Sequence, residues 1–120
     1  MESSEFEKLV TDALDQIPVM IRDRLDNVDV VVDDWPSQDQ LLGSGLKEGE
    51  FMLGLYEGLP LTERYDYGMV LPDKITLFKG SIESICSDED EIIREIQNTI
   101  VHEVAHHFGI EDERLQEMGL

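Results

Sequence analysis

The sequence HEVAHHFGIED, residues 102–112, contains all three histidines of this 120-residue chain. His102 and His106 lie four residues apart, and Glu103 directly follows the first of them. In a helix, residues at this spacing lie one above the other, so both imidazoles can reach one metal ion at about 2.0–2.1 Å. Glu103 lies one step further around the helix, where its carboxylate can reach a water on that metal without binding the metal itself. This stretch therefore predicts a metal site.

The segment from about Asp88 to Phe108 is expected to form the helix that carries these residues. Ser87 is the expected N-cap, and Gly109 suits the left-handed position that ends many helices. Its apolar residues gather on one side, which is expected to face the core: Ile93, Ile96, Ile100, Val104 and Phe108. His102 and His106 fall on roughly the opposite side. The alternative to a metal site is an exposed helix face that carries two histidines by chance.

A third ligand is needed, because catalytic zinc usually binds three protein side chains and leaves one position for water. In the longer pattern HExxHxxGxxH, the third ligand follows the second histidine by six residues, and a glycine lets the chain turn back. Gly109 occupies the glycine position here, and Asp112 occupies the ligand position. An aspartate oxygen can bind zinc at about 2.0–2.2 Å. Asp112 is therefore the expected third ligand, with Glu111 and Glu113 as alternatives at poorer spacing.

The rest of the chain predicts an α+β domain with one small mixed sheet. An amphipathic helix is expected near the N-terminus, where the apolar stripe is Phe6, Leu9, Val10, Ala13, Leu14 and Ile17. Ser4 and Glu7 match a capping box at its start, and Pro18 is expected to break it. Strands are expected over residues 28–35, 51–58 and 74–80, separated by loops over residues 37–50 and 59–73. Residues 81–86 are expected to form a short helical turn. One domain is expected to span residues 1–120.

Charge and cysteine content narrow the class of protein. The chain has 28 acidic and 9 basic side chains, a net charge of −19. Such a surface repels nucleic acid and anionic lipid and favours a basic peptide or protein as partner, although the charge also serves solubility alone. The single cysteine, Cys86, has no partner for an internal disulfide. The acidic N-terminus is unlike a signal peptide, and no apolar run reaches the ~20 residues of a membrane span. A cytoplasmic location is expected.

Three segments together resemble the small zincin-like metallopeptidases of bacteria, which are minimal matrix-metalloprotease-like domains. They are FMLGLYEGLPLTER (residues 51–64), LPDKITLFKGSIE (71–83) and TIVHEVAHHFGIEDERLQEMG (99–119). The resemblance extends over about residues 6 to 119. It implies a reduced zincin fold in which His102, His106 and Asp112 hold one Zn²⁺ per chain and Glu103 is the general base. Larger relatives of this kind have a methionine turn after the third ligand, and no such role is assigned to Met118 here.

The resulting functional prediction is hydrolysis of peptide bonds by a zinc-activated water. A peptide is expected to lie antiparallel along an edge strand, for which residues 51–57 and 75–78 are candidates. Arg64, Tyr65 and Tyr67 are candidates for stabilising the oxyanion, with loop packing as the alternative role. His107 lies about 100° around the helix from His106, so a packing or ligand-orienting role is expected for it. The competing prediction is a zinc-stabilised binding module with little or no hydrolysis.

Overall fold

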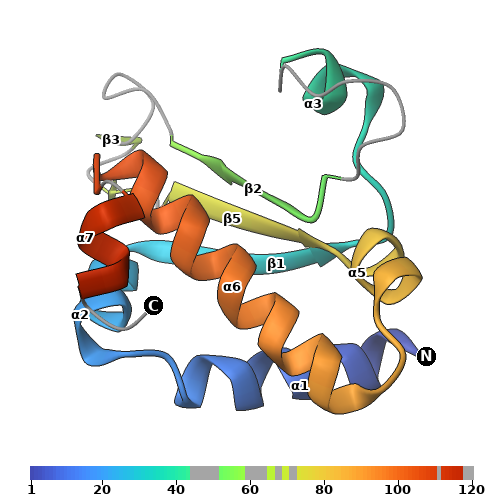
Figure 1. The fold of residues 1–120 in the computed structure, drawn as a ribbon. Helices are drawn as coiled ribbons and strands as arrows, with labels where there is room; N and C mark the ends of the chain where they lie inside the picture. Colours follow the sequence, from blue (N-terminus) through green and yellow to red (C-terminus); the bar gives the residue numbers. More distant parts are fainter. Residues whose placement is uncertain (44–51, 59–64, 67–68, 71–72, 111, 118–120) are drawn as a thin grey trace.

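The structure is a computed structural model that describes residues 1–43, 52–58, 65–66, 69–70, 73–110 and 112–117. It describes only the backbone of five of these residues: Tyr65, Asp66, Met69, Val70 and Asp112. A three-stranded mixed sheet forms one layer, and the long helix α6 (Glu89–His107) crosses one face of it with α1 (Ser3–Asp15) packed beside α6 (Figure 1). The predicted α+β architecture, a small mixed sheet with an N-terminal helix and a long helix in the C-terminal part of the chain, is confirmed.

Helix α1 buries the predicted apolar stripe and ends before Pro18. Its buried residues are Phe6, Leu9, Val10 and Ala13. The predicted capping box is wrong, because the N-cap is Glu2, which makes no side-chain capping bond. After the break, α2 (Val19–Arg22) and the 3-10 helix η1 (Asp23–Leu25) lead into the sheet. The Arg22 guanidinium donates to the carbonyl oxygens of Leu14 (2.9 Å) and Asp15 (2.6 Å) and so caps the C-terminal end of α1.

The sheet has the strand order β1-β5-β2. Strand β1 (Val28–Asp33) pairs parallel with β5 (Asp73–Phe78), and β2 (Gly54–Glu57) pairs antiparallel with β5 on its other side. All three predicted strands are present and shorter than predicted, and β5 begins at Asp73, one residue before the predicted start. Of the two predicted edge segments, residues 51–57 contain the edge strand β2. Residues 75–78 were wrongly predicted as an edge, because β5 is the central strand and both its sides are paired.

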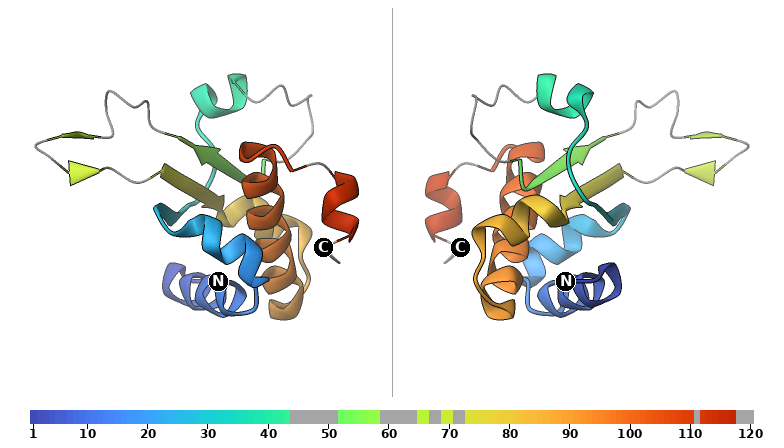
Figure 2. Two further views of the ribbon diagram at one scale, coloured as in Figure 1. Left: turned by 90° about the vertical axis from the view of Figure 1, so that its left-hand side faces the viewer. Right: turned by 90° about the vertical axis from the view of Figure 1, so that its right-hand side faces the viewer.

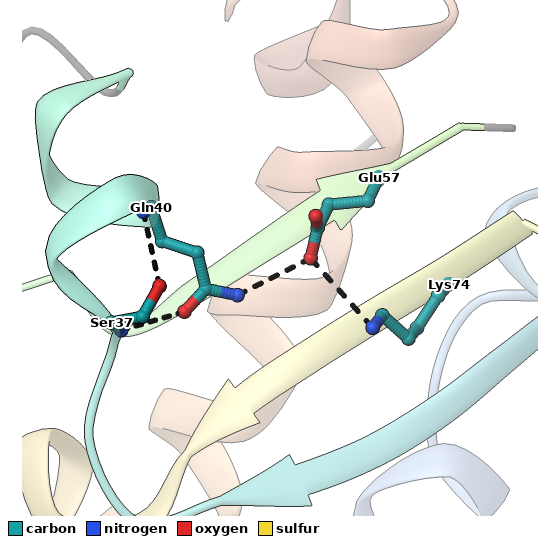
Figure 3. Close-up of polar contacts among 4 residues, drawn as sticks. All are labelled: Ser37, Gln40, Glu57 and Lys74. Carbon is teal, nitrogen blue, oxygen red and sulfur yellow. Dashed lines mark hydrogen bonds and ion pairs between the residues drawn. The ribbon is translucent and has the colours of Figure 1, made fainter.

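Three further elements, one helix and two short strands, lie inside the predicted loops. Helix α3 (Gln38–Leu42) begins with a capping box, in which Gln40 N donates to Ser37 Oγ at 3.1 Å and Ser37 N donates to Gln40 Oε1 at 2.8 Å. Gln40 Nε2 also donates to Glu57 of β2 at 3.3 Å, and Glu57 pairs with Lys74 of β5 at 3.9 Å (Figure 3). The short strands β3 (Tyr65–Asp66) and β4 (Met69–Val70) pair antiparallel. The predicted helical turn is α5 (Lys79–Ile85).

Helix α6 supplies the largest share of the core. Its buried side chains include Ile96, Ile100 and Val104, which pack with Ile75 and Leu77 of β5 in one cluster. Two details of the predicted helix are wrong. The N-cap is Asp88, whose side chain accepts from Glu91 N at 2.8 Å, so Ser87 lies outside the helix. Phe108 is 42% exposed instead of buried, because α6 ends at His107.

No helix in the part of the chain that the structure describes is long and apolar enough to cross a membrane.

Candidate metal centre

The C-terminal end of α6 is closed by a turn at Gly109. Gly109 has a φ of +71°, a conformation that glycine adopts without a Cβ penalty. Ile110 N donates to Ala105 O at 2.7 Å, and Gly109 N donates to His106 O at 3.3 Å. These two bonds form a Schellman motif, as predicted for a glycine that ends a helix. Helix α7 (Asp112–Glu117) follows directly, on the α6 side of the sheet (Figures 1 and 2).

The imidazoles of His102 and His106 are both exposed, on the face of α6 opposite its core residues. His102 Nδ1 lies 2.7 Å from the carbonyl oxygen of Asn98, one turn earlier in α6. A carbonyl oxygen can only accept, so Nδ1 donates to it, and in the neutral imidazole Nε2 then keeps the lone pair that a metal needs. Histidines that bind metals typically donate their second ring nitrogen in this way, which fixes the orientation of the ring. His102 is therefore prepared to bind a metal through Nε2, and His106 lies one turn further along.

Glu103 is half-buried and points between α6 and the edge strand β2. Burial raises the pKa of its carboxyl group above the ordinary value. Three influences act in the opposite direction on this pKa: the charge of His106, a hydrogen bond from the backbone N–H of Tyr56, and the charge of His102. The bond from Tyr56 ties the carboxylate to β2. Glu103 therefore lies between the two exposed histidines and the edge of the sheet.

A close contact between α6 and β2 sets the position of Glu103. A Cβ atom added at Gly54 would lie 2.4 Å from Thr99 Cγ2 and 3.1 Å from Thr76 O. Only glycine allows α6 to approach β2 this closely. Thr99 is one turn before Glu103, and Gly54 is two residues before Tyr56 on the same face of β2. The Gly54–Thr99 contact therefore brings the Tyr56 amide within reach of Glu103.

His107 has surroundings that differ from those of its neighbour His106. Its ring stacks on Tyr56, with 3.9 Å between ring centroids and 17° between the planes, and meets Phe108 edge-on at 5.0 Å. His107 Nε2 lies 3.9 Å from Oδ2 of the buried Asp73, which also accepts from the Tyr56 hydroxyl at 2.7 Å. These contacts anchor the end of α6 to β2 and β5. The predicted role of His107, to pack or to orient a metal ligand, stays a prediction.

The other predicted site residues lie, in whole or in part, outside the portion of the chain that the structure describes. Asp112 is the first residue of α7, and nothing is described of its side chain. Tyr65 is in β3 with only its backbone described, whereas Arg64, Tyr67, Glu111 and Met118 lie outside the described residues. Among the side chains that are described, no group of three or more His, Cys, Asp or Glu residues could hold a metal ion. His102 and His106 therefore form the described part of the candidate centre, and their chemistry fits zinc.

Sequence reasoning did not identify four residues that arrange this centre. Asn98 could have been found, because its carbonyl lies one helical turn before His102. Gly54, Tyr56 and Asp73 come from two strands, and their contacts with α6 depend on how the helix packs on the sheet. No local pattern in the sequence indicates those contacts.

A helix that presents two histidines one turn apart, with the intervening glutamate against an edge strand of a small mixed sheet, has the arrangement of a zincin. The model of the zincin-like metallopeptidase family matches residues 25–120, and the chain therefore belongs to that family. A conserved hypothetical protein from Thermo thermophilus has a similar solved structure, with a TM-score of 0.56 and 26% sequence identity. The alignment covers 90% of this chain and 94% of that one. The search of curated proteins finds no match.

Proposed function

We propose that this protein is a zinc-dependent metallopeptidase in which His102, His106 and Asp112 hold one zinc ion and Glu103 is the general base. The observation that carries the proposal is the surroundings of Glu103. Its half-buried carboxylate accepts from the backbone N–H of Tyr56 in β2 and lies beside two exposed histidines, one of which donates through Nδ1 and so can bind a metal through Nε2. Membership of the zincin-like metallopeptidase family supports the same chemistry.

Each residue at the site has its own role in the proposed reaction. Bound zinc would supply the Lewis acidity that polarises the scissile carbonyl. Glu103 takes a proton from the attacking water and passes it to the leaving amine. Burial of Glu103 supports this role, because its raised pKa makes the carboxylate a stronger base than an exposed glutamate. The hydrogen bond from Tyr56 N–H holds the Glu103 carboxylate in position while Glu103 receives the proton from water and passes it to the amine.

The outer edge of β2, which pairs with no other strand among the described residues, is the proposed alignment site for an extended peptide. Phe78 N donates to Leu53 O at 2.9 Å, and in an antiparallel ladder the bonded pairs alternate. Gly54 and Tyr56 therefore direct their backbone groups away from β5, toward the open edge. Glu103 accepts from Tyr56 N–H at this edge, so a peptide that pairs with the neighbouring backbone groups of Gly54 would lie directly alongside the base. Arg64, Tyr65 and Tyr67 remain the proposed oxyanion donors.

Metal analysis of purified variants tests the proposed ligands. The wild-type protein is expected to bind close to one zinc per chain. His106→Ala and Asp112→Ala should each lose tight binding, because two remaining ligands do not complete a catalytic zinc site. Glu113→Ala is the matched control, since it removes the next carboxylate in α7 and should leave the zinc content unchanged. Full zinc content in Asp112→Ala would show that the third ligand is wrong.

Peptide cleavage separates the proposed enzyme from a zinc-stabilised binding module. The enzyme should cleave members of a broad peptide library when loaded with zinc and stop when zinc is chelated. A binding module would unfold on chelation and cleave none of the peptides. Wild-type protein that neither contains zinc nor binds added zinc would contradict both functions.

A further inference from the structure

The sheet has a second free edge on the side away from β2. Among the described residues, β1 pairs only with β5. Asp73 N donates to Asn27 O at 3.1 Å, and the residues of a parallel strand alternate in the direction of their backbone groups. Asp29, Val31 and Asp33 therefore bond toward β5. The N–H and C=O groups of the three alternate residues point to the open edge: Val28, Val30 and Val32.

A groove of about 790 Å³ runs beside the first half of this edge. It lies between the end of α1, the turn formed by α2 and η1, and the start of β1. Four half-buried apolar side chains line it: Leu14, Leu25, Val28 and Val30. These side chains pack against the core on one side and contact the groove on the other. The groove therefore offers both an apolar surface and unpaired backbone groups to the same occupant.

The charges around the groove indicate what kind of occupant it suits. Four exposed carboxylates line it: Asp15, Asp23, Asp26 and Asp29. The single cation among the lining residues is Arg22, whose guanidinium donates to the carbonyls at the end of α1. The groove therefore has four carboxylates against one guanidinium, and that guanidinium is already engaged. An anionic chain would be repelled here, whereas lysine and arginine side chains would find acceptors.

We propose that the free edge of β1 and this groove bind an extended, basic segment of a partner polypeptide by strand addition. The segment would add a fourth strand to the sheet through hydrogen bonds to Val28, Val30 and Val32. Apolar side chains at alternate positions would cover the floor of the groove, and lysines or arginines would meet the aspartates. This surface is separate from the edge near Glu103, because β5 lies between β1 and β2.

Fluorescence anisotropy on the 120-residue chain tests the charge preference. The probe is a labelled octapeptide in which lysine alternates with valine, and the control peptide has glutamate in place of lysine. The lysine peptide should bind with an affinity that falls as salt increases, whereas the glutamate peptide should not bind. Mass spectrometry afterwards checks that the probe has not been cleaved, so the result does not depend on hydrolysis. Absence of binding at low salt would overturn the proposal. The aspartates would then serve only to prevent aggregation through an exposed edge strand.

A pair of variants with equal charge changes locates the binding site. Asp23→Asn with Asp26→Asn should weaken binding of the lysine peptide by about fivefold, which corresponds to about 1 kcal/mol for the two exposed ion pairs together. The control, Glu5→Gln with Glu89→Gln, removes two exposed charges at the far ends of α1 and α6 and should have little effect. Equal weakening by both pairs would show general charge attraction and would overturn the assignment to this groove.

Amide hydrogen exchange tests strand addition itself. The bound peptide should slow exchange at Val28, Val30 and Val32, whose amides point to the open edge, by at least about tenfold. Asp29 and Val31 already bond to β5, so their exchange should change little. Binding without protection of the three valines would contradict strand addition, whatever the affinity.

Discussion

Neighbouring residues at the end of α6 have different surroundings because each residue turns the helix by about 100°. His106 is exposed beside His102, whereas His107 stacks on Tyr56 and faces Asp73. The spacing of the histidines was enough to predict that His102 and His106 lie away from the core. The contact between Glu103 and Tyr56 could not be predicted, because it joins residues that are distant in the sequence.

Cys86 provides a test of the electrostatics of this acidic chain. Burial raises the pKa of its thiol above the ordinary value, and the negative charges of Glu95, Glu91 and Asp88 raise it further. Only the thiolate reacts with iodoacetamide, so a raised pKa leaves less of the reactive form at neutral pH. Alkylation of Cys86 at pH 8 is therefore expected to be several times slower than that of a free thiol. Its rate should still be increasing at pH 9.

Mass spectrometry of the alkylated protein measures these rates. Glu91→Gln removes one of the nearby negative charges and should speed the reaction at pH 8. A rate in the wild-type protein equal to that of a free cysteine would show that the thiol is neither shielded nor influenced by these carboxylates.

The elements of the fold were largely predictable from local patterns, whereas their ends and contacts were not. The apolar stripes of α1 and α6 and the β-branched strand β1 reflect periodicity, which the sequence shows directly. Helix α3 was missed because its capping box, Ser37 with Gln40, lies in a polar, glycine-containing segment. Asp88 rather than Ser87 caps α6, since either residue type can accept the capping bond and the choice depends on the path of the preceding chain.

Packing of α6 on β2 at Gly54 should be sensitive to a single methyl group. Gly54→Ala would place its Cβ 2.4 Å from Thr99 Cγ2, so the helix or strand must shift. We expect a loss of about 1–3 kcal/mol in the free energy of unfolding, measured by urea denaturation. Peptide cleavage should fall as well, because the shift separates Glu103 from the Tyr56 amide of β2.

Gly43→Ala is the matched control for the change at Gly54. A Cβ at Gly43 would have its nearest contact at an ordinary 3.6 Å, and the residue already has a φ of −80°. Its stability should change by less than about 1 kcal/mol. Equal effects of the two substitutions would contradict the close approach of α6 to β2.

Gly109→Ala tests the turn between α6 and α7. No atom lies within 4 Å of a Cβ added there, so the cost comes from the left-handed backbone alone. We expect a loss of about 1–2 kcal/mol in unfolding free energy, together with weaker zinc binding if the turn places Asp112 at the metal. Gly109→Asn should recover part of both losses, because asparagine tolerates this conformation better. Unchanged zinc affinity in a destabilised Gly109→Ala protein would separate Asp112 from the site.

For the whole molecule, the net charge of −19 opposes folding through self-repulsion. Raising NaCl from 10 to 200 mM shortens the Debye length from about 30 Å to about 7 Å and should stabilise the native state. A gain of about 1 kcal/mol would raise the Tm by about 4 °C in a domain of this size. Calorimetry with chelator present keeps zinc binding from contributing to the change. A Tm that falls with added salt would show that attractive surface pairs dominate instead.

The order of the strands in the sheet was harder to predict from the sequence than the individual residues or elements. From the sequence, residues 75–78 were as good a candidate for an edge strand as residues 51–57, since both segments are short and apolar. The structure makes β5 central, and its residues from Ile75 to Phe78 are buried. That arrangement leaves β2 and β1 as the two edges, one beside Glu103 and one beside the acidic groove. The HExxH spacing predicted the candidate site, but its relation to an edge strand required the fold.

Peptide cleavage by zinc-loaded Glu103→Gln tests the central claim most directly, with zinc content measured in the same samples. Glutamine keeps the size of the side chain but cannot accept a proton, and Glu103 does not bind the metal in this account. The variant is therefore expected to hold as much zinc as the wild-type protein while its cleavage rate falls by a factor of about 10²–10⁴. Cleavage at the wild-type rate with full zinc content would contradict the assignment of Glu103 as the general base.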